Sequence, residues 1–301
     1  MTGEDAIAEL LRDLKAAEYH FTAVTPATHA RVLERPAPAK LELRDIFGWN
    51  RSFGAGHLDE RLLALSEAAD ALEQSGGQLR SKVRVASLDA HLFAHGAFPT
   101  TAPDAVFFGP DTYRFVRFVQ RQLGGLSRSG WLVDMGSGCG AGGIMSADGF
   151  GRVTLVDVNP SALSLARANA AAAGVQVETL ASDAIPKGAS LVIANPPYMM
   201  DADARQYRDG GALLGGAVAL DWCRQALEAL APGGTFLLYS GAAYVRGESP
   251  VIAAVEQLCG AAGASLAIEE IDPDVFGEEL AQPAYAQVER IAAIGAVITL
   301  R

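Results

Sequence analysis

Cysteine is scarce in this sequence of 301 residues, which holds three: Cys139, Cys223 and Cys259. The number is odd and the positions are far apart, so we expect neither a disulfide framework nor a paired set of metal ligands. Free cysteines are typical of a reducing compartment. The first 20 residues are acidic and resemble a helix rather than a signal peptide. We therefore expect a cytoplasmic protein.

Long apolar runs and an excess of positive charge are missing as well. The best apolar run, residues 291–300, is shorter than the roughly 20 residues that cross a bilayer, so no membrane partner is expected. Lys and Arg number 24 against 35 Asp and Glu, a net charge of −11, which excludes a general field for holding nucleic acid. A local basic patch for a structured RNA stays open. Arg80, Lys82 and Arg84 alternate along one predicted strand, although solvated charge is the ordinary interpretation.

Half of the residues are hydrophobic, which is enough to bury a large core. The pattern changes near residue 105. Before it, the sequence predicts helices over residues 4–18 and 58–74, the second ending at Gly76-Gly77, and two alternating segments over 82–86 and 88–94. We expect a smaller N-terminal α+β domain for substrate recognition over residues 1–105, and a catalytic domain over residues 106–301.

From residue 131 onward, apolar strand-like runs alternate with helix-like stretches. This alternation predicts a doubly wound, Rossmann-like α/β fold, because each crossover lays a helix on a mostly parallel sheet. Asn159-Pro160 predicts a helix start, and Gly174 its left-handed end. The last two strands have no clear helix between them, so we expect an antiparallel pair at one edge. The seven predicted strands lie within residues 131–135, 153–158, 175–180, 191–194, 235–240, 266–271 and 291–300.

A glycine-rich loop follows the first of these strands, with Gly136, Gly138 and Gly140 in the run VDMGSGCGAGG. Such a loop brings the backbone close to a ligand and aims a helix N-terminus at it. Gly138, Gly140 and Gly143 also satisfy the dinucleotide pattern G-x-G-x-x-G, which many nucleotide-binding folds share. The loop predicts a nucleotide-like ligand and leaves its identity open.

Three acidic residues surround this loop after successive strands. Asp134 precedes Gly136 by two positions, where a carboxylate repels a pyrophosphate and attracts an ammonium group. Asp157 ends the next strand, where it can accept hydrogen bonds from both ribose hydroxyls, and Asp183 is placed for an adenine amino group. Taken singly, each could be a turn former or a solvated strand end. Together they favour a cationic adenosine cofactor without phosphates, S-adenosylmethionine (SAM), over NAD.

The tetrapeptide Asn195-Pro196-Pro197-Tyr198 ends a buried strand. Two prolines cannot donate to a ladder and they stiffen the backbone, so Asn195 is held at the carboxyl edge of the sheet, where such folds bind ligands. The side-chain oxygen of Asn195 and the carbonyl of Pro196 can each accept one N–H bond of a planar NH2 group, and Tyr198 offers a face for stacking. We expect these residues to position an amide or aniline-type nitrogen for in-line methyl transfer. A proline-stiffened strand end is the purely structural alternative.

The order of these motifs resembles a known family. VDMGSGCG, the acid at Asp157, SDA around Asp183, and NPPY look like class I SAM-dependent methyltransferases. More narrowly, they resemble the amino-methylating branch with the HemK-type glutamine methyltransferases and several ribosomal RNA base methyltransferases. The segment FGPDTYRFV, residues 108–116, resembles the Pro-x-x-Asp-Thr helix start of those enzymes, which implies that Thr112 lies near the methionine carboxylate. The resemblance covers about residues 107–301.

By this resemblance, the cofactor is SAM and the acceptor is a glutamine of a protein or a base of ribosomal RNA. The five histidines show no metal-ligand spacing, so no metal is expected. Two other functions stay open on the residues alone. The G-x-G-x-x-G match favours a nicotinamide-dependent oxidoreductase, which NADH binding would reveal. A non-catalytic SAM-binding or ribosome-docking module would bind the cofactor and methylate nothing.

Overall fold

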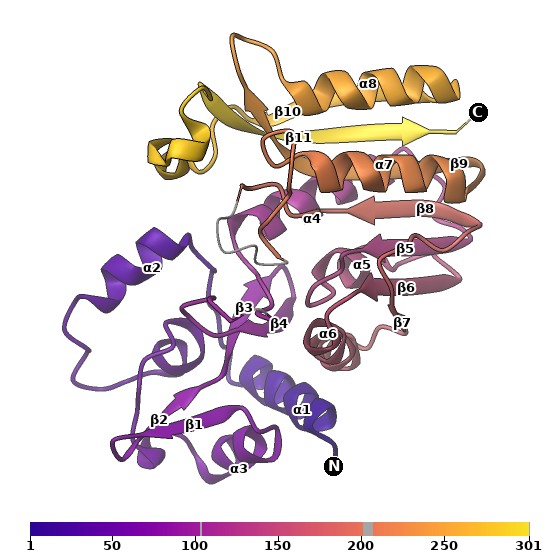
Figure 1. The fold of residues 1–301 in the computed structure, drawn as a ribbon. Coiled ribbons are helices and arrows are strands. Elements are labelled where there is room, and N and C mark those ends of the chain that lie inside the picture. The colour runs from indigo at the N-terminus through magenta and orange to yellow at the C-terminus, as the bar shows by residue number, and fades with distance from the viewer. Residues whose placement is uncertain (103, 201–206, 301) are drawn as a thin grey trace.

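The central sheet has seven strands in the order β10-β11-β9-β8-β5-β6-β7 (Figure 1). The computed structural model describes residues 1–102, 104–200 and 207–300. Neighbouring strands from β9 to β7 are parallel, whereas β11 runs antiparallel to both β9 and β10. The prediction of a mostly parallel, doubly wound sheet with an antiparallel pair at one edge is confirmed. The strands are β5 (Trp131–Met135), β6 (Arg152–Asp157), β7 (Glu178–Ala181), β8 (Ala189–Ala194), β9 (Leu230–Tyr244), β10 (Ser265–Asp272) and β11 (Arg290–Thr299).

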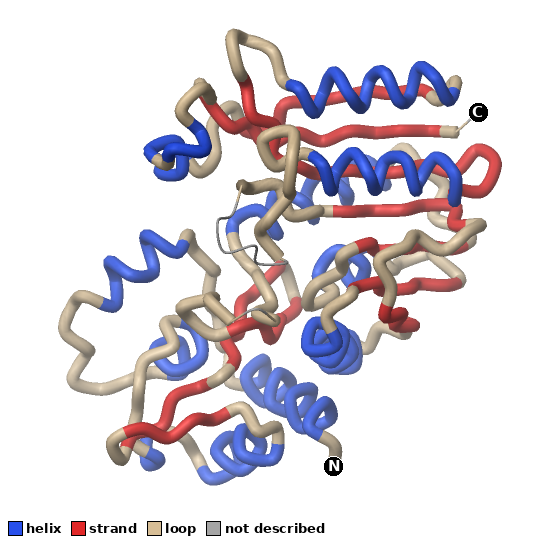
Figure 2. Tube along the Cα trace, viewed as in Figure 1, coloured by secondary structure: helices blue, strands red, loops and turns tan. Residues whose placement is uncertain are grey.

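Helices cover both faces of this sheet (Figure 2). Alternate residues of a strand point to opposite faces. In β8, Leu191 and Ile193 belong to one core cluster, while Val192 and Ala194 belong to the other. Strand β8 is therefore apolar on both sides, as in sheets whose two faces are buried. The first cluster takes in α4 (Pro110–Leu123), α5 (Ala141–Ser146) and α6 (Pro160–Ala173), and the second takes in α7 (Ala217–Ala229) and α8 (Pro250–Ala262).

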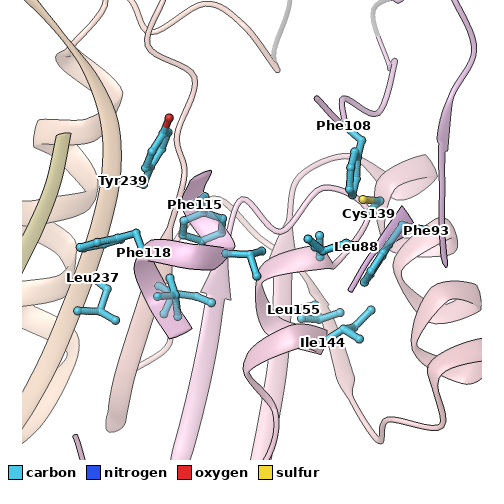
Figure 3. Close-up of a cluster of buried hydrophobic side chains, with 14 of the residues drawn as sticks. Leu88, Phe93, Phe108, Phe115, Phe118, Cys139, Ile144, Leu155, Leu237 and Tyr239 are labelled. Carbon is cyan, nitrogen blue, oxygen red and sulfur yellow. The ribbon is translucent and has the colours of Figure 1, made fainter. Parts of the chain in front are cut away.

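Large aromatic side chains fill the core beside α4 (Figure 3). Phe115 and Phe118 of this helix share a cluster with Leu237 and Tyr239 of β9, and all four are at most 3% exposed. A Cβ on Gly295 of β11 would lie 2.4 Å from Cε2 of Phe118, so glycine leaves the room that this ring needs. Burying each such ring stabilises the fold by roughly 1.5–3 kcal/mol. This packing holds the start of α4 at the carboxyl edge of the sheet.

Helix α6 begins and ends where the sequence predicts. The side chain of Asn159 accepts a hydrogen bond from Ser161 N at 2.9 Å, and Pro160 occupies the first turn. Gly174 ends the helix in the left-handed region, with φ of 72°. Because this helix follows β6 almost directly, its start fixes the end of β6, where Asp157 lies.

The N-terminal region is a smaller α+β unit. The predicted antiparallel element over residues 82–94 is confirmed as the hairpin β3–β4. The predicted helix over residues 58–74 is wrong in its second part, since the helix ends at Ala68 and residues 72–75 form β1. Gly76 and Gly77, with φ of 58° and 79°, make the tight turn that pairs β1 with β2 and overrides the helical pattern. The elements are α1 (Gly3–Ala16), α2 (Pro26–Leu33), the π-helix η1 (Arg44–Gly48), the 3-10 helix η2 (Ala55–His57), α3 (Glu60–Ala68), β1 (Leu72–Ser75), β2 (Gln78–Ser81), β3 (Val83–Leu88) and β4 (His91–Gly96).

A buried asparagine joins the N-terminal region to the glycine loop. Asn169 of α6 is 0% exposed, and its Oδ1 accepts a hydrogen bond from Ala94 N at 2.8 Å. Its Nδ2 donates to Ala94 O at 3.0 Å and to Cys139 O at 2.9 Å. A buried amide left without these partners would cost roughly 1–3 kcal/mol. The bonds therefore fix β4 against the loop that carries the predicted cofactor residues.

Candidate functional site

A cavity of about 820 Å³ lies between the carboxyl edge of the sheet and the N-terminal region. It collects side chains from the ends of β5, β6 and β8 and from the start of α4, which is where open α/β sheets bind ligands. Gly140 is the one predicted site residue that does not line it. The predicted residues that do are Thr112, Asp134, Gly136, Gly138, Asp157, Asp183, Asn195, Pro196, Pro197 and Tyr198.

The glycines of the loop have different surroundings. Gly138 has φ of 53°, and a Cβ added there would meet no atom within 4 Å, so its bare Cα faces open cavity. Gly140, with φ of 84°, precedes α5 and packs inward, where an added Cβ would lie 3.0 Å from Ile144 Cδ1 and 3.1 Å from Ala166 Cβ. The first glycine leaves space for a ligand, and the second lets the helix pack.

Asp134 is a buried carboxylate in the wall of the cavity, 2% exposed. Its Oδ2 accepts a hydrogen bond from Gly143 N at 2.7 Å. Burial raises its pKa to about 7, the amide of Gly143 opposes the rise, and the charge of Asp157 adds to it. Because burial makes the anionic form of Asp134 costly, the position suits a cationic ligand, whose ammonium group would compensate the lost hydration.

The side chain of Asp157 is fixed by two backbone amides, one from the glycine loop and one from the start of α6. Its Oδ2 accepts a hydrogen bond from Gly138 N at 2.8 Å, and its Oδ1 accepts one from Asn159 N at 2.9 Å. Burial raises the pKa of Asp157, and these backbone bonds oppose the rise. Each carboxylate oxygen keeps a second lone pair, so the fixed side chain can still accept two ligand hydroxyls.

Two apolar residues at this end of the cavity were not identified from the sequence. Val158 is 49% exposed and follows Asp157 directly. Trp222 of α7 covers the loop, since a Cβ on Gly136 would lie 2.3 Å from its Cη2. Asp183 also lines the cavity, as an exposed carboxylate. Val158 could have been predicted to line the cavity, because it directly follows Asp157 in the sequence. Trp222 could not, because its place over the loop depends on how α7 packs.

The side chain of Asn195 lies at the end of β8. Its Oδ1 is buried and has no hydrogen-bond partner within the described part of the chain. Pro196 is buried and Pro197 is partly buried, and neither has an amide hydrogen that could compete for this oxygen. Ser137 in the same wall also has a buried hydroxyl without a partner among the described residues. Such groups are rare in folded proteins, and those lining a cavity point to a ligand.

The ring of Tyr198 packs closely against Gly241 in the cavity wall. A Cβ on Gly241 of β9 would lie 2.2 Å from Cδ2 of Tyr198, so the ring rests on bare backbone. The side chain is 8% exposed, and burial followed by the charge of Asp111 raises its pKa far above the ordinary value. The ring of Phe276 lies 6.1 Å away at 59°. Tyr198 is thus a neutral, fixed aromatic surface of the cavity.

The wall opposite the sheet comes from the N-terminal region. Pro26, Ala27 and Ala30 of α2 contribute small side chains, and residues 98–101 contribute a loop. In this loop, Phe98 N donates to Asn50 Oδ1 at 3.0 Å, and the Arg80 guanidinium donates to the Phe98 carbonyl. These wall residues carry no motif, so no pattern in the sequence marks them as part of a site.

A stacked aromatic pair lines the cavity. The rings of Phe107 and Tyr207 are stacked at 5.9 Å with an angle of 8° between their planes. Tyr207 Oη also donates to Thr100 O at 2.6 Å. The chain after the tetrapeptide is therefore joined to the N-terminal loop that forms the opposite wall.

The hypothesis of a basic stripe on β2 and β3 is wrong at Arg84. This side chain is 4% exposed, its Nε donates to Gly96 O at 3.0 Å, and its Nη1 lies 3.3 Å from His29 Nδ1. Burial lowers the pKa of Arg84 to about 10. Neither RNA nor solvent reaches this guanidinium, since it is directed into the N-terminal core.

Residues 1–102, 104–200 and 207–300 contain neither a metal-binding cluster nor a membrane-spanning helix. No three side chains of His, Cys, Asp or Glu are grouped there so as to hold a metal ion. No helix in these ranges combines the length and the apolar character that crossing a membrane requires.

Residues 115–241 match the methyltransferase small domain family. The release factor glutamine methyltransferase of Deinococcus radiodurans is 29% identical over 229 residues, which cover 70% of this chain and 80% of that protein. The enzyme of the same name from Koribacter versatilis is 38% identical over 128 residues, covering 36% of this chain and 46% of its own length. The chain thus spans less than half of the second relative.

Solved structures share the fold at low sequence identity. Trm5b from Pyrococcus abyssi has a TM-score of 0.51 at 15% identity, over 79% of this chain and 68% of that chain. Trm5 from Methanocaldococcus jannaschii, in complex with adenosine, has a TM-score of 0.50 at 14% identity, over 73% of this chain and 56% of that chain.

Proposed function

Since the chain is a class I SAM-dependent methyltransferase with a methyltransferase small domain, we propose that it methylates the NH2 nitrogen of a planar amide or exocyclic amine. The observation that carries the proposal is the buried Oδ1 of Asn195, which lines the cavity and has no partner among the described residues. A buried acceptor of this kind requires an N–H donor, and an NH2 group of the acceptor molecule supplies one.

The cavity wall fits SAM at several points. Asp157 would bind the ribose hydroxyls. Beside it, Gly138 leaves space for the ligand, and the Ser137 hydroxyl, which has no partner among the described residues, is available for a hydrogen bond. Asp134 would hold the ammonium group, with Thr112 near the carboxylate of the methionine moiety. Val158 and Trp222 would enclose the adenine, with Asp183 at its amino group. When bound, SAM supplies an electrophilic methyl group on a positively charged sulfur.

The tetrapeptide would orient the acceptor nitrogen. An amide or aniline nitrogen is a poor nucleophile because its lone pair is delocalised. Asn195 Oδ1 and the Pro196 carbonyl would each accept one of its N–H bonds, which directs the lone pair out of the hydrogen-bonded plane. Pro197 stiffens the backbone that carries both acceptors, and Tyr198 would stack on the planar group. Catalysis then comes from positioning and electrostatics, with no covalent intermediate on the protein.

We infer that the acceptor is a glutamine side chain of a protein. A nucleic-acid base would bring phosphates to the cavity, where the described carboxylates outnumber the cations. The one described cation in the lining, Arg208, is ion-paired with Glu279 at 2.5 Å. The small apolar wall from α2 and residues 98–101 would receive the polypeptide, which gives the N-terminal region its recognition role. The carboxylates in the lining are Asp111, Asp134, Asp157, Asp183 and Asp209.

The proposal also places the enzyme in the cytoplasm. All three cysteines are free and buried, as suits a reducing compartment. The methyl donor and protein acceptors of the translation apparatus would both be accessible there.

Labelling with tritiated SAM tests the proposal. Extract from cells that lack the protein is incubated with the purified enzyme, and the labelled product is treated with protease or with ribonuclease. We expect protease-sensitive label that is lost with Asn195→Ala, while calorimetry shows SAM binding retained. Removing one positioned hydrogen-bonding group costs about 10²–10³-fold in turnover.

Asn195→Asp is the matched variant, because it keeps an oxygen acceptor in nearly the same shape. We expect it to retain more activity than Asn195→Ala. Label that ribonuclease removes would show that the acceptor is a nucleic-acid base and not a protein. Full turnover by Asn195→Ala would refute the assignment of Asn195 to the NH2 site.

A further inference from the structure

The connection between β10 and β11 contacts the chain on both sides of residues 201–206. This connection, residues 273–289, contains two 3-10 helices, η3 (Gly277–Ala281) and η4 (Pro283–Tyr285). In Figure 1 it lies at the end of the β10–β11 pair that is farther from the marked C-terminus. We propose that it is a brace whose Tyr285 and Glu279 are positioning residues for Asn195. The inference rests on the proposed function, since it explains how the acceptor site keeps its geometry.

Tyr285 fixes the residues directly after the tetrapeptide. It is 1% exposed, and its Oη accepts a hydrogen bond from Met200 N at 2.7 Å. The same Oη lies 3.9 Å from Met199 Sδ, to which it donates. A buried hydroxyl that satisfies a backbone amide here ties the peptide at Met200 to η4.

Glu279 fixes the chain on the other side of residues 201–206. Its carboxylate pairs with the guanidinium of Arg208 at 2.5 Å, and the two side chains are 12% and 21% exposed. Met199 N donates to Arg208 O at 3.0 Å, and Gly210 N donates to Met199 O at 2.8 Å. The stretch around Arg208 is thereby joined both to the brace and to the residue that follows Tyr198.

The brace is itself anchored to the sheet and reaches the cavity. Val275 N donates to Ile291 O of β11 at 2.7 Å. The next residue, Phe276, lines the cavity and faces the ring of Tyr198 at 6.1 Å. The brace thus connects the antiparallel strand β11 to the tetrapeptide through direct contacts.

Within the described part of the chain, backbone contacts hold the tetrapeptide on both of its sides. On its N-terminal side, β8 and the two prolines hold Asn195 rigidly. On its C-terminal side, the described hydrogen bonds of Met199 and Met200 lead to Arg208, Gly210 and Tyr285. A displacement of about 1 Å at a reacting centre can cost on the order of 100-fold in rate. The hydroxyl of Tyr285 therefore acts on turnover through Asn195 without touching the acceptor.

Tyr285→Phe tests the brace, with Tyr19→Phe as the matched control. Tyr19 is also a buried tyrosine whose hydroxyl bonds to backbone, donating to Val85 O at 2.8 Å in the N-terminal core. We expect Tyr285→Phe to lower the turnover of the acceptor at least tenfold while the Kd for SAM stays within twofold. Tyr19→Phe should leave both unchanged. Glu279→Gln is the second variant, and we expect the same split between turnover and SAM binding.

Amide exchange supplies a readout that does not depend on activity. The chain has five methionines, so labelling with ¹⁵N-methionine gives a simple spectrum in which Met135 of β5 is the internal reference. We expect the Met200 amide to exchange at least tenfold faster in Tyr285→Phe, with Met135 unchanged.

Unaltered exchange at Met200 would overturn the brace, and so would faster exchange with normal turnover. A wild-type protein that methylates no NH2 acceptor would instead overturn the proposed function. The exchange rate of Met200 would still decide whether Tyr285 holds this segment.

Discussion

The titration of Asp134 predicts how SAM binding depends on pH. This carboxylate is buried, bonded to Gly143 N, and has a pKa raised to about 7. If it holds the ammonium group of SAM, binding requires the anionic form, so affinity falls as the pH drops below about 7. One unit below the pKa, the neutral form outnumbers the anion about tenfold, and the Kd rises by about the same factor.

Asp134→Asn removes the charge and keeps a group that accepts from Gly143 N. A hydrogen bond to a charged group contributes about 1.5–3 kcal/mol, so near pH 7.5 the variant should bind SAM on the order of 10- to 100-fold more weakly than the wild type. Its Kd should be nearly constant between pH 5.5 and 7.5. The Kd values for SAM of the wild type and of Asp134→Asn should therefore become more similar as the pH falls.

The raised pKa of Asp134 also predicts how the stability of the protein without SAM depends on pH. Stability falls as the pH rises, whereas SAM affinity increases. The pKa of Asp134 is raised from 3.8 to about 7, so the folded state binds more protons than the unfolded state between these values. The stabilising contribution is complete below pH 3.8 and is lost as the pH rises through 7. At pH 8, the buried anion costs up to about 4 kcal/mol, and Asp134→Asn should unfold at higher urea concentration than the wild type.

Calorimetric titration of SAM at half-unit steps from pH 5.5 to 8.5, with urea unfolding in parallel, measures both effects. Asp157→Ala is a useful control, because it should weaken SAM binding at every pH and keep a pH dependence, which shifts to lower pH since the charge of Asp157 contributes to the raised pKa of Asp134. A wild-type Kd that stays constant between pH 6 and 7.5 would refute the assignment of Asp134 to the ammonium group.

Three further substitutions have defined outcomes. Gly138→Ala introduces a Cβ into open cavity at φ of 53° and should raise the Kd for SAM at least about tenfold by calorimetry; an unchanged Kd would place the cofactor elsewhere. Gly241→Ala puts a Cβ 2.2 Å from the Tyr198 ring, so single-turnover methyl transfer should fall on the order of 100-fold with SAM binding kept. Arg80→Met releases the Phe98 carbonyl and should raise the KM for the acceptor but not the Kd for SAM, and equal changes in both would contradict the wall assigned to the acceptor.

The α/β fold could be predicted from local patterns because each pattern has a local cause. The apolar runs over β5, β8 and β11 correspond to strands buried on both faces. Asn159 and Gly174 delimit α6 by backbone geometry that depends on immediate neighbours. The helix prediction over residues 58–74 was wrong in its second part, because another local structure competed with the helix there. The turn at Gly76-Gly77 and the pairing of β1 with β2 competed with helix propensity, and the pairing prevailed.

The site was predictable where a motif ends a strand. Asp134, Asp157 and Asn195 reach the cavity because the carboxyl ends of parallel strands meet at one edge of the sheet. Gly140 belongs to the same motif but packs against Ile144 and Ala166, since α5 starts there and turns it inward.

The order of residues along the chain determines the conformation near each residue, and through it the strands, the helix ends and the motif side chains at the sheet edge. Distances between separate elements depend on the packing of the whole core. The wall from α2, the stacking of Tyr207 on Phe107, the burial of Arg84 and the contact of Tyr285 with Met200 are therefore decided by tertiary structure alone. Each of these joins segments that are far apart in the chain, and no local pattern encodes how close such segments come.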